Sequence, residues 1–460
     1  MDTQKLRQRI LDLAIRGKLV PQDPNDEPAS VLLDRIRAEK ERLIAEGKLK
    51  RPKAKKSTDK SHYQNFTPPF DIPDSWEWVN IKEVTSKITD GTHHSPENKP
   101  IGDFLYITAK NIKYDGIKID SATYVNSNVH TEIYSRCNPE YGDILYIKDG
   151  ATAGVVAIND LNVPFSMLSS VALIKPLGIL NRYLYYFLRS DFSNSSIKKS
   201  MKGVGITRIT LRQIEEWNIP VPPYAEQERI VKILDNYFSI LSYLEWNIDT
   251  LQESIHNAKS KILDLAMQGK LVPQNPSDEP AADMLRRINP KAKIITDNPH
   301  YPQLPDNWVL VPLEDITEYE QPQPYIVQDT FYSDTYTIPV LTAGKSFILG
   351  YTNEDFGVYE NVPAIIFDDF TTDSKLVEFH FKVKSSAMKI IQVKRGLSIE
   401  YVAMFMSTTR LIGETHKRYW ISEYSKILIP IPPLEEQNRI VEKVNSIYCE
   451  LDKIISALSE

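Results

Sequence analysis

The residues of the sequence with the clearest chemical use are basic side chains that gather in two stretches. Residues 198–212 read KKSMKGVGITRITLR, with five basic residues and no acid, and residues 415–420 read THKRYW. Lysine and arginine contact phosphates, and arginine, lysine, asparagine and glutamine read base edges in the major groove. Solvated surface loops explain each stretch equally well when it is taken alone, but both stretches shortly precede a Pro-Pro pair, and this matching placement favours binding. The side chains predicted to contact DNA are Lys110, Asn111, Lys113, Lys148, Lys198, Lys199, Lys202, Arg208, Lys345, Lys375, Lys417, Arg418 and Tyr419.

Three fragments imitate cofactor or catalytic motifs, but each lacks a residue that the chemistry needs. Val221-Pro-Pro-Tyr224 has valine where an amino-methyltransferase motif needs an amide or acid, and its second copy reads Ile431-Pro-Pro-Leu434. Gly344-Lys345-Ser346 ends like a phosphate-binding loop, but Pro339 stands where the first glycine belongs. Gly203-Val-Gly205 lacks the third glycine of a dinucleotide-binding loop.

Two acidic groups are also weak candidates for catalysis or metal binding. Asp373-Ser-Lys375 near Asp368 and Asp369 resembles half of a nuclease site, but such triplets are common and the carboxylates are too close in sequence. Asp90 with His93 and His94 has the side chains of a metal site, although a polar loop facing DNA is the favoured interpretation. We therefore predict a chain with no catalytic site and no metal of its own.

The composition bounds the remaining classes of protein. Among the 460 residues, 55 are basic and 61 acidic, a net charge of −6 that excludes a polybasic protein coating nucleic acid by bulk attraction. Hydrophobic residues make up 42% and charged residues 25%, which is typical of globular proteins. Two cysteines and the lack of a long apolar run predict a reducing cytoplasm rather than a secreted or membrane protein.

The chain repeats itself. LDLAIRGKLVPQDPNDEPA (11–29) and LDLAMQGKLVPQNPSDEPA (263–281) agree at 15 of 19 positions. Two further pairs follow in the same order: IPDSW (72–76) with LPDNW (304–308), and IPVPPYAEQERIV (219–231) with IPIPPLEEQNRIV (429–441). The segments between these landmarks share little sequence. A repeated framework around different inserts indicates one scaffold that presents two different binding surfaces.

After each Pro-Pro pair the apolar residues follow a heptad, which is typical of a coiled-coil seam. The alternation runs on at the N-terminus of the chain. The predicted seam consists of Ile230, Leu234, Leu241, Leu244, Ile248, Leu251, Ile255 and Ile262 in the centre, Ile440, Val444, Ile447, Leu451, Ile454 and Leu458 at the C-terminus, and Leu6, Ile10 and Leu13 at the N-terminus.

The repeat offsets predict a circular arrangement. Glu460 corresponds to Thr250 at offset 210, and Met1 corresponds to Glu253 at offset 252. The C-terminal and N-terminal segments together thus match one central helix of about 44 residues, or roughly 65 Å. We expect two such helices, antiparallel to each other, and chain termini that lie close together.

Within the inserts the pattern changes to short β-rich runs, at 155–158, 170–174, 364–367 and 376–382, and to short helices at 181–188 and 398–406. Each insert is therefore expected to be a compact α/β domain. The predicted boundaries are an N-terminal conserved helix and linker at 1–62, a first insert at 63–218, a central conserved region with the long helix at 219–300, a second insert at 301–427, and a C-terminal conserved helix at 428–460.

The repeated stretches resemble those of type I restriction–modification specificity subunits, over the whole chain and in the same order. The resemblance implies an α/β fold, with two divergent target-recognition domains separated by an antiparallel coiled coil in a circular pseudo-two-fold repeat. It also implies a non-catalytic role, in which each domain reads one half of an asymmetric, bipartite double-stranded DNA target and the helices set the distance between the half-sites.

The partners and cofactors follow only from that resemblance. It implies two modification subunits, which bring S-adenosylmethionine for adenine methylation, and restriction subunits, which bring ATP, Mg²⁺ and translocation. The segments 17–28 and 269–280 and the helix faces outside the seam would be the docking surfaces. The alternatives are the recognition part of a stand-alone DNA methyltransferase or nuclease, and a coiled-coil scaffold that carries two carbohydrate- or peptide-binding domains.

Overall fold

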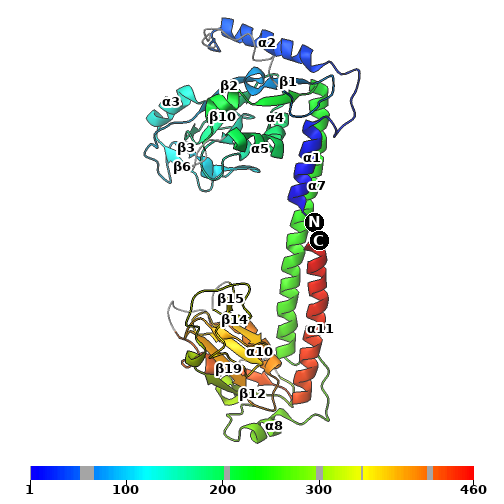
Figure 1. Cartoon of the computed structure of the whole chain (residues 1–460), viewed down its shortest axis with the longest axis vertical. Coiled ribbons are helices and arrows are strands. Elements are labelled where there is room, and N and C mark those ends of the chain that lie inside the picture. Colours follow the sequence, from blue (N-terminus) through cyan, green and yellow to red (C-terminus); the bar gives the residue numbers. More distant parts are fainter. Residues whose placement is uncertain are drawn as a thin grey trace. The chain divides into compact units, whose positions relative to one another are not determined.

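The computed structural model describes residues 2–51, 67–200, 208–296, 304–342, 346–411 and 418–459. The chain divides into two compact units, Met1–Trp246 and Asn247–Glu460, each with its own core. The helix α7 (Tyr224–Met267) is 44 residues long and supplies its first part to unit 1 and its second part to unit 2 (Figure 1). The long helix predicted after the first Pro-Pro pair is therefore confirmed.

Unit 1 is built around an antiparallel four-stranded sheet in the order β2-β10-β7-β8. A three-stranded sheet, β6-β3-β9, lies beside it, and β1 pairs with β11 where the domain returns to α7. The strands are β1 (Glu77–Asn80), β2 (Thr85–Asp90), β3 (Phe104–Ile107), β4 (Ile112–Lys113), β5 (Gly116–Ile117), β6 (Thr123–Val125), β7 (Ile144–Ile147), β8 (Val156–Ile158), β9 (Ser166–Met167), β10 (Val171–Pro176) and β11 (Asn218–Val221). The helices are α1 (Thr3–Ile15), α2 (Ala29–Ala45), α3 (Ser127–Arg136), α4 (Asn181–Arg189), α5 (Asp191–Ser200) and α6 (Leu211–Glu215), with 3-10 turns η1 (Ile81–Val84) and η2 (Ala109–Asn111).

The two faces of this sheet are both buried, which explains why its strands read as continuous apolar runs. Ile144 and Tyr146 of β7 face the helices and share a core with Leu184 of α4. Leu145 and Ile147, the alternate residues, face the second sheet. The period of two along β7 thus places each side chain in one of two separate cores.

Unit 2 repeats this plan with different residues. Its four-stranded sheet has the order β13-β19-β16-β17, its three-stranded sheet the order β15-β14-β18, and β12 pairs with β20. The strands are β12 (Val309–Pro312), β13 (Thr317–Glu320), β14 (Ile338–Leu341), β15 (Ile348–Thr352), β16 (Ala364–Asp368), β17 (Ser374–Val377), β18 (Lys382–Val383), β19 (Met388–Val393) and β20 (Leu428–Ile431). The helices are α8 (Ala281–Ile288), α9 (Leu313–Ile316), α10 (Ile399–Thr408) and α11 (Leu434–Ser459), with 3-10 turns η3 (Gln323–Tyr325) and η4 (Tyr424–Lys426).

The expected strands and short helices of the inserts are present, with one difference. The runs at 155–158, 170–174 and 364–367 form β8, β10 and β16, and the helices at 181–188 and 398–406 form α4 and α10. The run at 376–382, expected as one strand, is divided, because β17 ends at Val377 and β18 begins at Lys382. Phe379, between them, is 43% exposed, so the chain leaves the sheet there rather than continuing it.

The framework contacts occur twice, once in each unit. The Tyr183 hydroxyl donates to the Pro220 carbonyl at 2.6 Å, and the Tyr401 hydroxyl to the Pro430 carbonyl at 2.8 Å. Trp76 Nε1 donates to Glu226 at 2.9 Å, and Trp308 Nε1 donates to Glu436 at 3.1 Å. These bonds fix the entry and exit strands of each insert to the first turn of a long helix.

In each unit a shorter helical partner runs antiparallel to part of α7. Figure 1 shows α1 beside the first part and α11 beside the second part. In unit 1, Arg7 bonds Glu245 at 2.8 Å whereas Gln22, beyond the end of α1, bonds Glu226 at 2.6 Å. In unit 2, Lys259 bonds Asp452 at 2.6 Å, and Tyr448 donates to the Lys259 carbonyl at 2.9 Å.

The seam positions differ in burial along these helices. Ile230, Leu234, Leu241, Ile255, Ile440 and Val444 are buried, and Ile10, Leu13, Ile248, Ile262, Ile447, Leu451 and Leu458 are intermediate. The exposed ones are Leu6 at 39%, Leu244 at 38%, Leu251 at 41% and Ile454 at 44%. In α1 the buried face is shifted by one residue from the predicted one, to Leu11, Ala14 and Ile15. The reason is that α1 packs on α4 and the domain core as well as on α7. A heptad pattern, which assumes contact with one other helix, therefore does not predict which of its residues are buried.

Of the helices in the described ranges, none combines the length and the apolar character that crossing a membrane requires.

Candidate nucleic-acid interface

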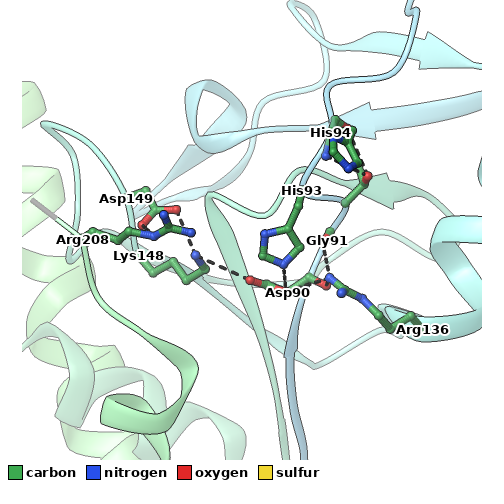
Figure 2. Close-up of polar contacts among 9 residues, drawn as sticks. Asp90, Gly91, His93, His94, Arg136, Lys148, Asp149 and Arg208 are labelled. Atoms are coloured by element: carbon green, nitrogen blue, oxygen red, sulfur yellow. Dashed lines mark hydrogen bonds and ion pairs between the residues drawn. The ribbon is translucent and has the colours of Figure 1, made fainter. Parts of the chain in front are cut away.

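At one end of the four-stranded sheet of unit 1, charged side chains converge from four segments (Figure 2). Asp90 is the last residue of β2, Arg136 the last residue of α3, Lys148 and Asp149 directly follow β7, and Arg208 lies ahead of α6. Asp90 and Arg136 are 46 positions apart in the sequence, so only the fold brings them together.

Asp90 is the centre of the cluster. Its carboxylate accepts a hydrogen bond from Arg136 Nη2 at 2.8 Å, and it lies 3.3 Å from His93 Nε2 and 3.5 Å from Lys148 Nζ. The side chain of Asp90 is only 4% exposed. A carboxylate buried to this extent needs paired charge to offset its lost hydration, and Arg136 and Lys148 supply it.

The second acid, Asp149, completes the arrangement. It accepts from Lys148 Nζ at 2.9 Å and lies 3.5 Å from Arg208 Nε. Lys148 is therefore a buried link between two acids, at 3% side-chain exposure. Arg136 and Arg208, in contrast, are 51% and 63% exposed. The two exposed arginines, here called the rim, thus lie beside a buried group of paired charges, Asp90, Lys148 and Asp149.

The loop after β2 passes through a narrow space. A Cβ on Gly91 would lie 1.9 Å from the Met167 carbonyl oxygen, so only glycine fits there. Thr92 then bonds the Met167 carbonyl through its N–H at 2.9 Å, which fixes the start of the loop that carries His93 and His94. In the described residues no group of three potential ligands could hold a metal ion.

Unit 2 has a matching sheet end, in which the residue that follows β16 has the opposite charge to the residue that follows β7 in unit 1. Asp369 directly follows β16, as Lys148 directly follows β7. The carbonyl of Lys148 accepts from Ile209 N at 2.9 Å, and that of Asp369 accepts from Tyr419 N at 3.0 Å. Asp369 lies 3.7 Å from Lys389 Nζ and accepts from the backbone N–H of Trp420 at 2.8 Å. The same backbone position thus carries a buried lysine in one unit and a buried aspartate in the other.

The residues predicted to contact DNA fall into three groups. Lys110, Lys113, Arg208, Lys375 and Arg418 are exposed. Asn111, Lys148 and Tyr419 are buried, at 2%, 2% and 3% exposure. Lys202, Lys345 and Lys417 lie outside the described residues, as do the side chains of Lys198 and Lys199.

The buried group takes part in the framework of the two units, and its contact with DNA stays a prediction. Asn111 Oδ1 accepts from Thr108 N at 2.9 Å and caps a 3-10 turn. Lys148 links two acids, and the backbone of Tyr419 closes the sheet end of unit 2. In the free chain these three residues are at most 3% exposed.

Sequence reasoning missed Arg136. It is a single arginine in the helical pattern of α3, outside any basic run, and no local signal marks it. His93 was considered as a metal ligand, but the structure places it beside Asp90 and Arg136 on a cationic rim (Figure 2).

Comparisons with known proteins agree on one family. Residues 73–251 match the model of the type I restriction modification DNA specificity domain. The EcoR124I/EcoR124II specificity subunit of Escherichia coli is 47% identical over 33% of this chain and 39% of its own length. The EcoAI specificity subunit of E. coli is 25% identical over 98% of this chain and 90% of its own length.

A third relative and a solved structure extend this agreement. The EcoEI specificity subunit of E. coli is 29% identical over 62% of this chain and 54% of its own length. A solved chain from a study of assembly and conformational transition of the type I R-M system has a TM-score of 0.57 over 85% of this chain and 94% of its own length, at 16% identity, and shares the fold. The chain is thus similar to type I restriction–modification specificity subunits, most strongly over residues 73–251.

Proposed function

We propose that this chain is the non-catalytic DNA-specificity subunit of a type I restriction–modification enzyme. Its two inserts are proposed to read the two halves of a bipartite, asymmetric DNA site. The observation that carries the proposal is that one framework, with the same buried contacts, holds two sheet ends that carry different side chains. Two domains that share one framework but differ at this sheet end are suited to a DNA target whose two halves differ in sequence.

The rims of the two sheet ends have the chemistry of DNA contact. Arg208 in unit 1 and Arg418 in unit 2 are exposed and lie 210 positions apart, at matching places in the repeat. Arg418 lies over the ring of Phe370, 5.8 Å from its centroid, and Phe370 is 40% exposed. Cations beside polar and aromatic groups suit phosphates and base edges. The net charge of −6 leaves bulk attraction for DNA to other subunits.

The helices are proposed to act as a spacer and a docking surface, in a circular pseudo-two-fold coiled coil. Support comes from the length of α7 and from the matching contacts of α1 and α11 with its two parts. The duplicated segments 17–28 and 269–280 offer equal surfaces for two modification subunits. Restriction subunits would join this complex in the cytoplasm. S-adenosylmethionine, ATP and Mg²⁺ are proposed to bind to the partner subunits.

The test is reconstitution. The purified chain, mixed with its modification subunit, labelled S-adenosylmethionine and DNA, should transfer methyl groups to a bipartite site, and the chain alone should transfer none. Methyl transfer by the chain alone would instead support the stand-alone methyltransferase alternative. Specific DNA retention by the mixture separates the proposal from a carbohydrate- or peptide-binding scaffold.

A second experiment tests the independence of the readers. Exchanging residues 301–427 for the second insert of a relative should change one half of the methylated sequence, as read by methylome sequencing. A change in both halves would contradict two independent readers.

A further inference from the structure

We propose that Arg136 and Arg208 are a pair of buttressed arginines through which unit 1 contacts its half-site, and that Asp90 and Asp149 are the residues that position them. This inference rests on the proposed function and deepens it, because it names contact residues that the sequence pattern does not reveal.

Arg136 is held at one corner of its guanidinium group. All of its hydrogen bonds use Nη2, which donates to the Asp90 carboxylate at 2.8 Å, to the Asp90 carbonyl at 2.9 Å and to the Gly91 carbonyl. Among the described residues, Nε and Nη1 have no protein partner, and the side chain is 51% exposed. A bidentate contact with guanine or with a phosphate needs two N–H donors of one guanidinium. Both such pairs, Nη1 with Nη2 and Nε with Nη2, include the nitrogen that Asp90 and Gly91 occupy, so Arg136 keeps Nη1 and Nε as separate donors, each for a single acceptor.

Arg208 is held in a similar way by the second acid. Its Nε lies 3.5 Å from Asp149 Oδ1, and the side chain is 63% exposed. The next residue, Ile209, is buried and donates its N–H to the Lys148 carbonyl at 2.9 Å. The backbone of Arg208 is thereby fixed at the sheet end, and its guanidinium is ion-paired with Asp149 through Nε.

Lys148 couples the two supports. Its Nζ lies 3.5 Å from Asp90 and 2.9 Å from Asp149, so the two acids share one buried cation. With Arg136 and Arg208, three permanent cations surround two acids, and the exposed ones are the arginines. The rim therefore has an excess positive charge that is available to DNA.

Buttressing has a consequence for specificity. A free arginine loses much rotamer freedom when it binds, whereas one already held by a carboxylate loses less. A held arginine also keeps its donors in one direction, which a base edge requires and a diffuse phosphate contact does not. We therefore infer that this pair discriminates between bases in addition to adding affinity.

The experiment measures methylation by the complex of this chain with its modification subunit. The substrates are the recognised site and a set of sites with single base changes in each half. Arg208→Ala should lower the preference for the recognised base at one or two positions of one half-site by roughly 10- to 100-fold. Arg136→Ala, which removes single donors, should lower it in the same half by roughly 3- to 10-fold. The other half-site should keep its preference. Asp90→Asn should act in the same half, because it removes the charge that holds Arg136 and keeps the shape.

Two further variants exclude simpler explanations. Arg136→Lys keeps the charge but not the planar group that Asp90 and Gly91 hold, and should fail to restore the base preference. Lys118→Ala removes a cation from an exposed pair with Asp115 in the same unit, outside the cluster, and should leave the preference within about twofold. Thermal unfolding midpoints of all variants identify any that lose the fold.

The outcomes are separable. If the wild-type complex shows no bipartite preference, the proposed function fails. If the wild type is selective, and Arg136→Ala and Arg208→Ala are both folded and keep every base preference, the inference that the two arginines discriminate between bases is wrong. Methylation that weakens equally for all sites would show that these residues act through their charge alone and would overturn the inference. A base preference fully kept by Arg136→Lys would have the same meaning.

Discussion

At the scale of single residues, buried polar side chains hold the framework. Trp76 is 3% exposed and donates Nε1–H to Glu226, which also accepts from Gln22 at 2.6 Å. Trp308, Gln274 and Glu436 repeat the same bonds in unit 2. A carboxylate in an apolar core is tolerated only when its oxygens are bonded, so these contacts explain why the same residue types occur in both copies.

Removal of the indole donor should destabilise one unit at a time. Trp76→Phe keeps an aromatic ring but leaves the Glu226 carboxylate one hydrogen bond short. We expect a loss of about 1–3 kcal/mol in the free energy of unfolding, measured by urea denaturation. Trp308→Phe should have a similar effect in unit 2. A loss far below 1 kcal/mol in both would mean that water replaces the indole.

The same carboxyls predict a pH dependence. Burial raises the pKa of Glu226 and of Glu436 above the ordinary range. The folded chain therefore binds these protons more tightly than the unfolded chain, and the stability they contribute is present below the ordinary pKa and is lost as pH rises through the raised one. Relative to Glu226→Gln, the wild type should lose stability as the pH rises above the ordinary glutamate pKa of about 4.3 and through the raised one. Parallel stability profiles for the two proteins would contradict the raised pKa.

At the scale of elements, the C-terminus of α1 illustrates how the framework is packed. Gly17 has a φ of +67°, and its N–H bonds the Ala14 carbonyl at 3.2 Å. A Cβ there would lie 2.4 Å from Pro73 Cγ. Gly269 repeats this with a φ of +69° and Pro305 at 2.5 Å. Glycine is needed both for the left-handed conformation that ends the helix and for the proline that lies against it.

A matched pair of substitutions separates these two causes. Gly47 ends α2 with a φ of +71°, but nothing lies within 4 Å of its Cβ position. Gly47→Ala should cost about 1–2 kcal/mol, for the conformation alone. Gly17→Ala should cost a further 1–3 kcal/mol or so, because Pro73 must move. Urea denaturation measures both, and equal costs would show that the proline contact adds nothing.

At the scale of the whole molecule, one helix belongs to two units. Residues Tyr224–Met267 form α7, and the boundary between the units falls within it, after Trp246. Each half carries the residues of a repeated framework that is completed by a chain end, α1 or α11. This division gives the proposed spacer role of α7 a physical basis, since backbone hydrogen bonds fix the length of the helix.

The proposed spacer role of the helices leads to a quantitative prediction. Deleting residues 243–249 from α7 together with 453–459 from α11 shortens both helices by about 10 Å, or about three base pairs. The methylated site should then have a spacer shorter by about three base pairs, as read by methylome sequencing. Deletion from α7 alone should disturb the pairing instead. A DNA spacer of unchanged length after the paired deletion would contradict the proposal that the helices set the distance between the half-sites.

The sequence by itself determined the duplication, the start of the long helix after each Pro-Pro pair, and most strands and helices of the inserts. These features are local, because periodicity, proline and repeated side chains act on their own neighbourhood. The prediction was weaker for α1, whose buried face is set by the domain as well as by α7, and for the run at 376–382, which two sheets share.

Only the tertiary structure decided which of the polar side chains are exposed. Asn111, Lys148 and Tyr419 have suitable chemistry but lie inside the protein, whereas Arg136, which no pattern marks, reaches the rim. The sequence specifies a charge, but its exposure depends on partners far along the chain, such as Asp90 for Arg136. Burial and pairing are properties of the packed fold, and for that reason the scaffold could be predicted from the sequence more completely than the surface it presents.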